Sequence, residues 1–341
     1  MITVSYNWDY KKVNGMTEQK KDRIIIVGAG VVDVLVNPVD ASVFEKGSVP
    51  VEHIKISTGG DALNESVILA RLRKDVENGD PKVSFISLVG TDDAGKTILS
   101  CCEREGIDTR FVTVDENQES SVNIVMVQED GNRIFFTNPK STLRKLSLEH
   151  LPERFPEDAG ILCMASIFVS FMLGNQEYAE IFRRAKVQGM TVCADMTKCK
   201  NHEKVTDMKE TFSQIDYLFA NEEEAGMVTG KSDRDEIADE FLKVGVKHVI
   251  MKCGGEGCYV CSEDKRQMFS AVPNVECLDT TGAGDTFAGG FLCALAEGKS
   301  LEECAKWGNA CGSITVEKVG ACTGIQNRDQ VLERLKRLEN L

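Results

Sequence analysis

Short apolar runs alternate with stretches of helical periodicity along most of this 341-residue chain. The run Arg23–Gly30 is almost entirely apolar and ends in glycines, which is typical of a strand buried on both faces of a parallel sheet. Similar strand-like runs occupy residues 83–89, 160–166, 190–195, 217–220, 248–252 and 257–260. Helical segments lie between several of these runs, so the pattern predicts an α/β fold with a mostly parallel sheet.

Two segments depart from this rhythm, because residues 37–58 and 111–138 contain short alternating pieces without a clear helix. In the second segment, Val122–Val127 is followed by Glu129-Asp130-Gly131-Asn132, and Asp-Gly between strand-like runs is a hairpin signal. The two inserts are predicted to pair as a small antiparallel β lid. The expected organisation is an N-terminal tail at 1–22, a lid at 37–58 and 111–138, and an α/β core at 23–36, 59–110 and 139–341.

Composition excludes several classes of partner. The net charge of −14 argues against nucleic acid and anionic membrane surfaces. No apolar run approaches the roughly 20 residues of a membrane span, and the polar N-terminus lacks the apolar middle of a signal peptide. The 13 cysteines are scattered through apolar segments, which favours reduced thiols and a cytoplasmic location. Cys258 and Cys261 lie in a strand-like run without a second metal-binding pair, so ordinary strand cysteines are expected.

The stretch Asp279–Phe287 carries the strongest chemical signal. Gly282 and Gly284 flank Ala283, so backbone N–H groups can approach a ligand closely, and a helix is predicted to begin at or near Asp285. Amides and the helix dipole at such a turn favour a phosphate or an oxyanion. Asp285 is then either a capping residue or a general base beside a transferring phosphoryl group. Asp279 and two threonine hydroxyls in the same turn favour the second interpretation.

A second site is predicted near the first strand. Gly28-Ala29-Gly30 suggests a dinucleotide fingerprint, but the third glycine of that fingerprint is replaced by Asp33. Asp33 is instead expected just beyond the carboxyl end of the first strand, where open α/β sheets bind ligands. Thr58–Asn64 then leads into a helix, and its paired glycines, Gly59 and Gly60, let backbone approach a ligand while Asn64 can bond a hydroxyl.

These two stretches resemble the two signatures of the ribokinase-like (PfkB) family of carbohydrate kinases, and the resemblance covers about residues 23–335. It implies a three-layer α/β/α sandwich with a β-sheet lid, and an enzyme that uses ATP and Mg²⁺. The resemblance makes Asp285 the catalytic base and gives the anion hole to Gly282, Ala283 and Gly284. It assigns the sugar to Asp33, Gly59, Gly60, Asn64 and Asp285.

Further matches to the family lie in later loops. Asn221 and Glu224 match a motif that organises magnesium and its waters, and their simpler interpretation is a capped, acidic first helical turn. The resemblance gives the nucleotide to Asn221, Glu224, Gly254, Gly257, Gly282, Gly284 and Asn309, with Lys252 in the same loop as a further candidate, and it gives a monovalent cation, K⁺, to Asp279, Thr281, Thr315, Lys318 and Gly320. Lys252 stands where a small hydroxylic residue is often found, and it either reaches a phosphate or is solvated.

A competing phosphate loop exists, because Gly90–Thr97 satisfies the P-loop formula after a strand-like run. Asp92 and Asp93 would place two negative charges inside that cradle, which argues against a nucleotide site. The same residues fit a structural Gly-x-Asp-x-x-Gly turn of the ribokinase-like family. On that interpretation, Lys96 extends into solvent from the first turn of a helix.

The expected function is an ATP-dependent kinase that phosphorylates a hydroxyl of a monosaccharide or sugar acid. Departures from the family pattern at Val31, Val32, Asp61 and Glu65 leave the acceptor open, including a nucleoside. Two other classes remain as alternatives: a P-loop NTPase that uses Gly90–Thr97, and a non-catalytic sugar-binding regulator. A homodimer is expected through the lid, because its short apolar strands would otherwise leave unpaired edges.

Overall fold

The computed structural model describes residues 21–40, 42–74, 80–128 and 133–339. Its centre is an eight-stranded sheet in the order β14-β13-β12-β11-β10-β9-β1-β4. The strands are β1 (Arg23–Val27), β4 (Val83–Ile86), β9 (Ala159–Ile167), β10 (Thr191–Met196), β11 (Tyr217–Asn221), β12 (His248–Lys252), β13 (Gly257–Ser262) and β14 (Arg266–Ser270). Pairing is parallel from β4 through β12 and antiparallel from β12 to β14. The predicted, mostly parallel sheet is thereby confirmed.

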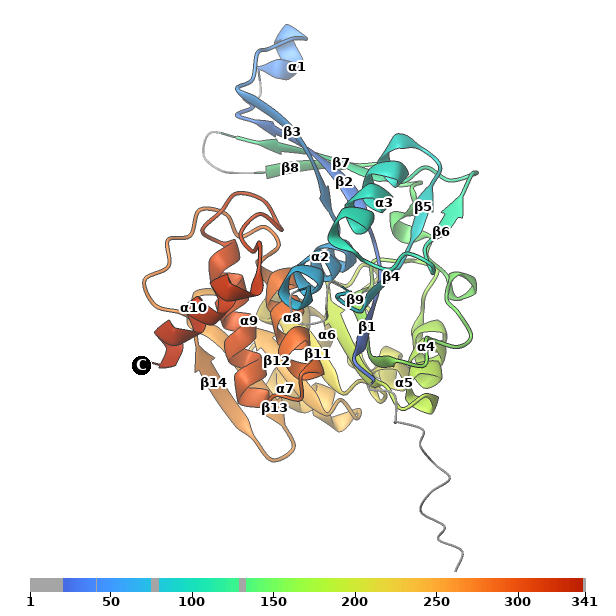
Figure 1. Cartoon of the computed structure of the whole chain (residues 1–341), viewed down its shortest axis with the longest axis vertical. Coiled ribbons are helices and arrows are strands. Elements are labelled where there is room, and N and C mark those ends of the chain that lie inside the picture. The colour runs from blue at the N-terminus through green and yellow to red at the C-terminus, as the bar shows by residue number, and fades with distance from the viewer. Residues whose placement is uncertain (1–20, 41, 75–79, 129–132, 340–341) are drawn as a thin grey trace, which may run out of the picture.

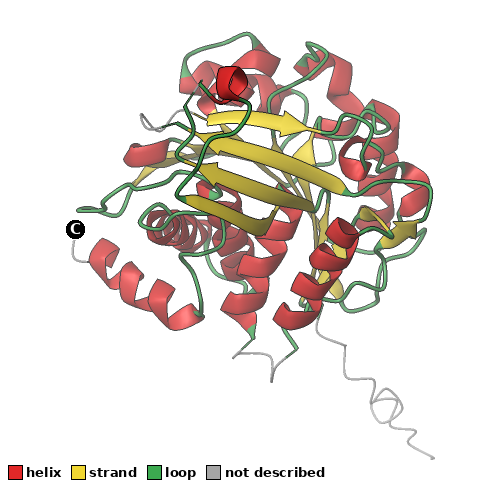
Figure 2. Ribbon diagram, turned by 90° about the horizontal axis from the view of Figure 1, so that it is seen from above, coloured by secondary structure: helices red, strands yellow, loops and turns green. Residues whose placement is uncertain are grey.

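Helices cover both faces of this sheet, as the view in Figure 2 shows. One hydrophobic cluster joins the sheet to α2, α3, α8, α9 and α10, and a second cluster joins it to α4, α5, α6 and α7. The bounds are α2 (Asp61–Arg73), α3 (Asp93–Glu105), α4 (Asn175–Val187), α5 (Lys209–Phe212), α6 (Glu222–Thr229), α7 (Arg234–Lys243), α8 (Ala283–Ala296), α9 (Leu301–Thr315) and α10 (Arg328–Glu339). Short 3₁₀ turns occur at Thr142–Arg144, Leu148–His150, Val205–Met208 and Gly254–Glu256. The chain is therefore a three-layer α/β/α sandwich.

The lid is a separate four-stranded sheet in the order β3-β2-β7-β8, which projects from the core together with α1 (Figure 1). Its elements are β2 (Val31–Asn37), α1 (Val43–Lys46), β3 (His53–Gly59), β7 (Ser121–Val127) and β8 (Arg133–Thr137). The sheet starts at Val31, earlier than the lid boundary expected at residue 37. Asp33 therefore lies on a lid strand and not in a loop after β1. The predicted hairpin turn at 129–132 lies outside the described residues.

The predicted strand at 83–89 is divided in two. Only β4 joins the main sheet, whereas β5 (Leu88–Gly90) pairs with β6 (Thr113–Asp115) in a small two-stranded sheet. The break directs the chain away from the core just before α3. β6 also removes part of the expected lid insert from the lid.

The side chains of the lid separate by strand alternation into two faces. Apolar residues of the outer face are exposed, including Ile54 at 68%, Ile56 at 66% and Phe136 at 46%. The inner face carries Asp33 and its register partner Ser57. An apolar outer face of this kind on a small sheet is a candidate for burial against another surface.

The cysteine and membrane predictions can also be compared with the structure. All 13 cysteines are free, and eleven of them are buried. Cys258 and Cys261 on β13 belong to the two different hydrophobic clusters, so they point to opposite sides of the sheet as expected. Within the described ranges, no helix is long and apolar enough to cross a bilayer.

Candidate active site

The carboxyl ends of four neighbouring parallel strands meet at one edge of the core sheet. β9, β10, β11 and β12 bring Ser166, Asp195, Asn221 and Lys252 to this edge. The first turns of α2 and α8 supply residues to the same place, since Asp61 and Asp285 line a cavity of about 350 Å³ together with Asp195, Asn221 and Lys252. We call this space the transfer cavity. It lies where open parallel sheets bind their ligands.

The glycine turn before α8 is shaped by close packing. Gly282 has φ +72°, and a Cβ there would lie 2.5 Å from the Cβ of Ala321, so no larger residue fits. The first i→i−4 bond of α8 joins Thr286 N to Gly282 O at 2.9 Å. The N–H groups of Gly284 and Asp285 belong to the first turn, where no carbonyl four residues earlier is part of the helix. Ala283 N, by contrast, donates to Thr280 O at 3.2 Å. The N-terminal turn thus directs amides toward the transfer cavity.

Asp285 occupies the third position of α8, because the helix begins at Ala283 with Gly282 as its N-cap. The capping interpretation of Asp285 is therefore wrong, whereas the start of α8 at Ala283 agrees with the helix predicted to begin at or near Asp285. Its Oδ2 accepts a hydrogen bond from Asn64 Nδ2 at 2.7 Å, which joins the two predicted signatures. Burial and the nearby charge of Asp61 raise the pKa of Asp285 to about 7, against the lowering effects of Asn64 and Lys252. A carboxylate with such a pKa is suited to accept a proton near neutral pH.

The lid contributes Asp33 on β2. Its Oδ1 accepts a hydrogen bond from Asn123 Nδ2 at 2.9 Å, and a Cβ on Gly59 would lie 2.1 Å from its Oδ2. Only glycine fits at position 59, because the Asp33 carboxylate occupies the space that a side chain would need. Burial raises the pKa of Asp33, and the charge of Asp61 adds to the effect. Asp33 also lines a cavity of about 560 Å³ between the inner face of the lid and the loop at Thr281, which we call the lid cavity.

Gly60 shapes the turn that enters α2. It has φ +91°, and a Cβ at this position would lie 2.6 Å from the carbonyl oxygen of Ala29. The glycine pair predicted from the sequence is thus needed for the chain to pass between β1 and Asp33. Asn64, one turn later, is buried and reaches Asp285.

Sequence reasoning left Asp61 and Asn123 without a role in the site. Asp61 is close enough to both Asp33 and Asp285 for its charge to raise the pKa of each carboxyl. Its Oδ2 accepts a short hydrogen bond from the Ser166 hydroxyl at the end of β9. The position of Asp61 directly after the glycine pair could have indicated from the sequence that this residue belongs to the site. Asn123 carried no such signal, because its contact with Asp33 depends on the pairing of β2 with β7.

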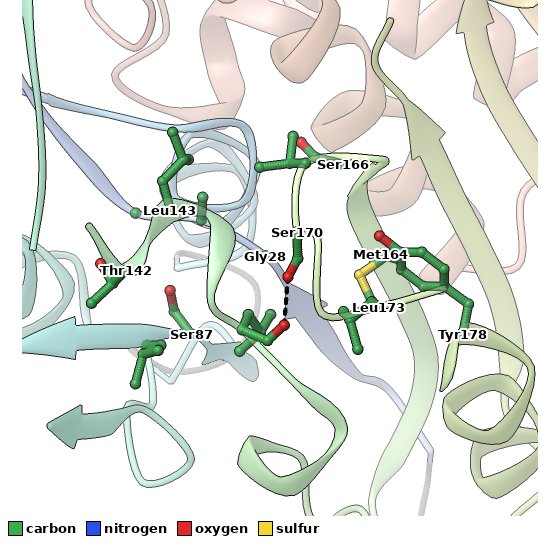
Figure 3. A pocket seen from close by; sticks show the side chains of 14 residues that line it. Gly28, Ser87, Thr142, Leu143, Met164, Ser166, Ser170, Leu173 and Tyr178 are labelled. Carbon is green, nitrogen blue, oxygen red and sulfur yellow. Dashed lines mark hydrogen bonds between the residues drawn. The ribbon is translucent and has the colours of Figure 1, made fainter. Parts of the chain in front are cut away.

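The glycines after β1 line a different and much smaller space, shown in Figure 3. Gly28, Tyr178, Ser166 and Ser170 are among its lining residues, and Ser170 Oγ donates to the carbonyl oxygen of Leu146 at 2.6 Å. Its volume is about 20 Å³, which holds about one water molecule. Such a space cannot take a dinucleotide, in agreement with the replacement of the third glycine by Asp33.

Lys252 and Asp195 form a bidentate ion pair inside the transfer cavity. Lys252 Nζ lies 2.7 Å from each carboxylate oxygen of Asp195, and the two side chains are only 16% and 4% exposed. Lys252 is therefore not solvated, and its contact with a phosphate stays a prediction. Burial by itself would lower the pKa of Lys252, but Asp195, Glu224 and Asp285 more than offset it and hold the pKa above its ordinary value.

Asn221 and Glu224 form a capping box at the start of α6. Asn221 Oδ1 accepts from Glu224 N at 2.8 Å, and Glu224 Oε2 accepts from Asn221 N at 2.9 Å. The simpler interpretation, a capped acidic turn, is thus correct as local structure. Both residues also line the transfer cavity, so the cap presents a carboxylate to it.

A cavity of about 540 Å³, the nucleotide cavity, adjoins the transfer cavity on the other side of Gly284. Gly254, Gly257 and Asn309, three of the residues predicted to bind the nucleotide, line it together. Gly257 has φ +112°, and a Cβ there would lie 2.1 Å from the carbonyl oxygen of Phe269. Asn309 Nδ2 donates to the carbonyl oxygens of Phe269 and Ser270 at 2.9 and 3.0 Å, so this side chain fixes the end of β14 at the cavity wall.

The residues predicted to hold a monovalent cation lie in the loop before α8, at the end of α9 and in the segment after α9. Asp279 Oδ1 accepts hydrogen bonds from Thr281 N and Oγ1 at 2.8 and 2.7 Å, and Oδ2 accepts from Gly320 N at 2.9 Å. Thr315 Oγ1 is buried, and no described residue hydrogen-bonds to it. Lys318 is exposed at the edge of this group and donates its backbone N–H to Thr315 O. Asp279 thereby joins the glycine turn to the segment after α9.

The competing phosphate loop has no open cradle. Asp92 carboxylate oxygens accept hydrogen bonds from Gly95 N and Ser120 N at 2.8 and 2.7 Å, and Gly90 N donates to Ser120 Oγ at 2.8 Å. Lys96 is 70% exposed and pairs with Asp93 at 3.1 Å. The amides that would hold polyphosphate are used inside the turn, so this loop caps α3 and does not form a P-loop.

The site thus brings together the N-terminal turn of a helix, a buried carboxylate on that turn, and two adjoining cavities. The sequence model of the pfkB family carbohydrate kinases matches residues 21–328, and the chain belongs to this family. Ribokinase from Haemophilus influenzae is 31% identical over 292 residues, which cover 84% of this chain and 89% of that protein.

Solved structures show the same fold. Arabidopsis thaliana ribokinase complexed with ribose and ATP has a TM-score of 0.75 and 25% identity, covering 92% of this chain and 98% of that one. Thermotoga maritima ribokinase has a TM-score of 0.76 and 24% identity, covering 92% and 99%. The predicted family, the ribokinase-like fold and the carbohydrate kinase class are therefore confirmed.

Proposed function

We propose that this protein transfers the γ-phosphoryl group of ATP to a hydroxyl of a monosaccharide or a closely related acceptor. The observation that carries the proposal is the position of Asp285. It lies in the first turn of α8, borders the transfer cavity, and is hydrogen-bonded to Asn64 from the other signature, the first. The base, the anion-binding turn and the predicted sugar-binding segment therefore belong to one site.

ATP would bind with its nucleoside in the nucleotide cavity and its γ-phosphoryl group at the turn Gly282–Asp285. Asp285 would take the proton of the acceptor hydroxyl while that oxygen attacks phosphorus. The amides of Gly284 and Asp285 would stabilise charge on the transferred oxygens. Ala283 contributes less than predicted, because its N–H already donates to Thr280 O.

The residues present fit the two expected cations. Mg²⁺ is commonly held by one or two carboxylates together with substrate phosphates and water, and Glu224 presents its carboxylate to the transfer cavity. Magnesium would neutralise charge on the phosphates. K⁺ would be held near Asp279, Thr281 and the buried, unsatisfied Thr315 Oγ1, behind the anion-binding turn.

The carboxylates around Asp285 restrict the acceptor. Asp33 lines the lid cavity, Asp61 and Asp285 line the transfer cavity, and the charge of Asp61 raises the pKa of both other carboxyls. Any acceptor group beside them must be a neutral donor such as a hydroxyl, because an acidic group would meet like charges. Lys55 and Arg104, which line the lid cavity farther away, offer a position for an acidic group at the opposite end of the acceptor. A neutral sugar is the acceptor that the inner end of the site fits best.

The lid supports a proposed homodimer. Most of its exposed apolar residues lie on the face opposite Asp33, so a second copy could cover them without blocking the acceptor, whereas Phe135 lies on the Asp33 face and lines the lid cavity. The residues concerned come from β3, β7 and β8: Ile54, Ile56, Ile124, Ile134 and Phe136. Burial of this face would stabilise the lid in the position in which Asp33 can contact the acceptor.

The function is tested by measuring ADP release from Mg-ATP in the presence of neutral monosaccharides, sugar acids and nucleosides. At least one neutral sugar should raise ADP release well above the rate without acceptor. Activity with nucleosides alone would identify a nucleoside kinase of the same fold. No stimulation by any acceptor would contradict the proposed transfer and favour a binding protein.

A further inference from the structure

Lys252 occupies the junction between the two cavities that the proposed transfer must connect. It lies at the end of β12, and three residues line both the nucleotide and the transfer cavity: Lys252, Gly254 and Gly284. Lys252 is the charged member of the three. A phosphoryl group that moves from ATP to an acceptor beside Asp285 must therefore pass its side chain.

The ammonium group also touches the anion-binding turn. A Cβ built on Gly284 would lie 3.3 Å from Lys252 Nζ, so the cation packs directly against the first turn of α8. The backbone amides at this turn and the lysine approach the same small volume from two directions. Together they provide donors around a tetrahedral anion that neither could surround by itself.

The surroundings of Lys252 are strongly acidic. Asp195 binds it through both oxygens, and Glu224 and Asp285 contribute further negative charge. Glu65 is fully buried in the same group and adds a further carboxyl near Asp195 and Asp285. The positive charge of Lys252 thus lies close to several carboxylates. A doubly charged phosphoryl group that enters this space would compete with Asp195 for the Lys252 ammonium.

We propose, on the basis of the function above, that Lys252 is a catalytic residue that exchanges Asp195 for the transferred phosphoryl group. In the resting site Asp195 acts as a positioning residue that keeps the ammonium at the junction. When ATP binds, Nζ turns to the γ-phosphoryl oxygens and stays with them during transfer. The bond from phosphorus to the β-phosphate oxygen breaks, and a bond to the acceptor oxygen forms. The acceptor proton goes to Asp285, and Lys252 remains protonated throughout.

This role predicts a difference between ATP and ADP that can be measured by binding. Calorimetric titration with a non-hydrolysable ATP analogue and with ADP, each with Mg²⁺, provides a readout that is independent of turnover. Lys252→Met should weaken the ATP analogue at least about tenfold, the size of a lost charge-assisted hydrogen bond. ADP binding should change less than about threefold. Lys96→Met, which removes an exposed lysine from α3, is the matched control and should change neither.

Turnover and stability separate catalysis from folding. Lys252→Met should lower kcat by about 10²–10³, as does loss of one preorganised transition-state donor. It also leaves Asp195 buried and unpaired, so its thermal stability should fall. The double variant Lys252→Met/Asp195→Asn removes that charge and should recover stability without recovering kcat. Recovery of kcat along with stability would show that Lys252 is only structural.

Asp195→Asn tests the exchange itself. It frees Lys252 from its resting partner, so affinity for the ATP analogue should be equal to or higher than that of the wild type. A loss as large as that of Lys252→Met would overturn the assignment of Asp195 as a resting partner. If the wild type phosphorylates no acceptor, the proposed function fails, yet loss of the ATP-over-ADP preference in Lys252→Met would still support phosphate binding by this lysine. Equal ATP binding and kcat within threefold in Lys252→Met would refute the proposal.

Discussion

Replacing Asp285 with Asn should lower turnover strongly and, at the same time, make the folded protein more stable at alkaline pH. Asp285 Oδ2 accepts its hydrogen bond from Asn64 at 2.7 Å, and an asparagine oxygen can accept the same bond. The geometry of the site should therefore persist. The variant cannot take a proton from an acceptor hydroxyl, so kcat should fall by at least about 100-fold, the lower end of the contribution of a positioned base.

The gain in stability follows from the electrostatics of the site. Burial and Asp61 raise the pKa of Asp285 from 3.8 to about 7. The folded protein then holds this proton more tightly than the unfolded chain, so ionised Asp285 lowers the free energy of unfolding as the pH rises through this interval. The difference corresponds to an upper limit of about 4 kcal/mol at pH 8, and of roughly 2 kcal/mol at pH 5.5. Asn removes this cost.

The assay combines urea unfolding at both pH values with nucleotide titration and turnover. Asp285→Asn should exceed the wild type in unfolding free energy, by more at pH 8 than at pH 5.5, and should bind ATP within about threefold of the wild type. Wild-type turnover in this variant would remove Asp285 from the role of base. A variant that is no more stable than the wild type at pH 8 would refute the electrostatic argument.

Four further predictions follow from the same geometry. kcat/KM should rise with pH through about 7, since the pKa of Asp285 is raised to that value and only its ionised form accepts a proton; a flat profile from pH 5.5 to 8.5 would contradict this. Lys96→Ala should leave kcat within a few-fold and cost less than about 0.5 kcal/mol of stability. Gly284→Val should stop transfer, because its side chain would crowd Lys252 and the anion-binding turn. An inactive Lys96→Ala beside an active Gly284→Val would instead support Gly90–Thr97 as the phosphate-binding loop. K⁺ should stimulate turnover more than Na⁺, and equal rates in K⁺ and in a large organic cation would contradict the proposed monovalent-cation site. Light scattering should give a dimer mass for the wild type and a monomer mass for Ile56→Lys; a wild-type monomer at tens of micromolar would disprove the lid interface.

Much of the fold could be predicted from the sequence because its strands are fully buried. β1 has all five residues buried, so its apolar run was unambiguous. The lid boundary was harder, since β2 follows β1 after only Gly28-Ala29-Gly30 and contains the polar Asp33. The division of 83–89 into β4 and β5 left no trace in hydrophobicity, because both pieces are buried.

The site was predictable where backbone geometry demands particular residues. Gly60 and Gly282 adopt positive φ and touch neighbouring chain, so their places in the sequence marked real turns. Contacts between distant strand ends were not predictable in this way. The pairing of Lys252 with Asp195 joins residues 57 positions apart on strands that are separated by β11. Only the order of the strands shows that the lysine enters the transfer cavity and not the solvent.

The most direct test of the account is a ³¹P NMR time course with Mg-ATP and the acceptor that stimulates ADP release. The account predicts a phosphate monoester signal that grows in step with ADP and stops growing in Asp285→Asn, although that variant still binds ATP. Inorganic phosphate as the sole product of the wild type, or an undiminished monoester signal from Asp285→Asn, would contradict transfer at this site.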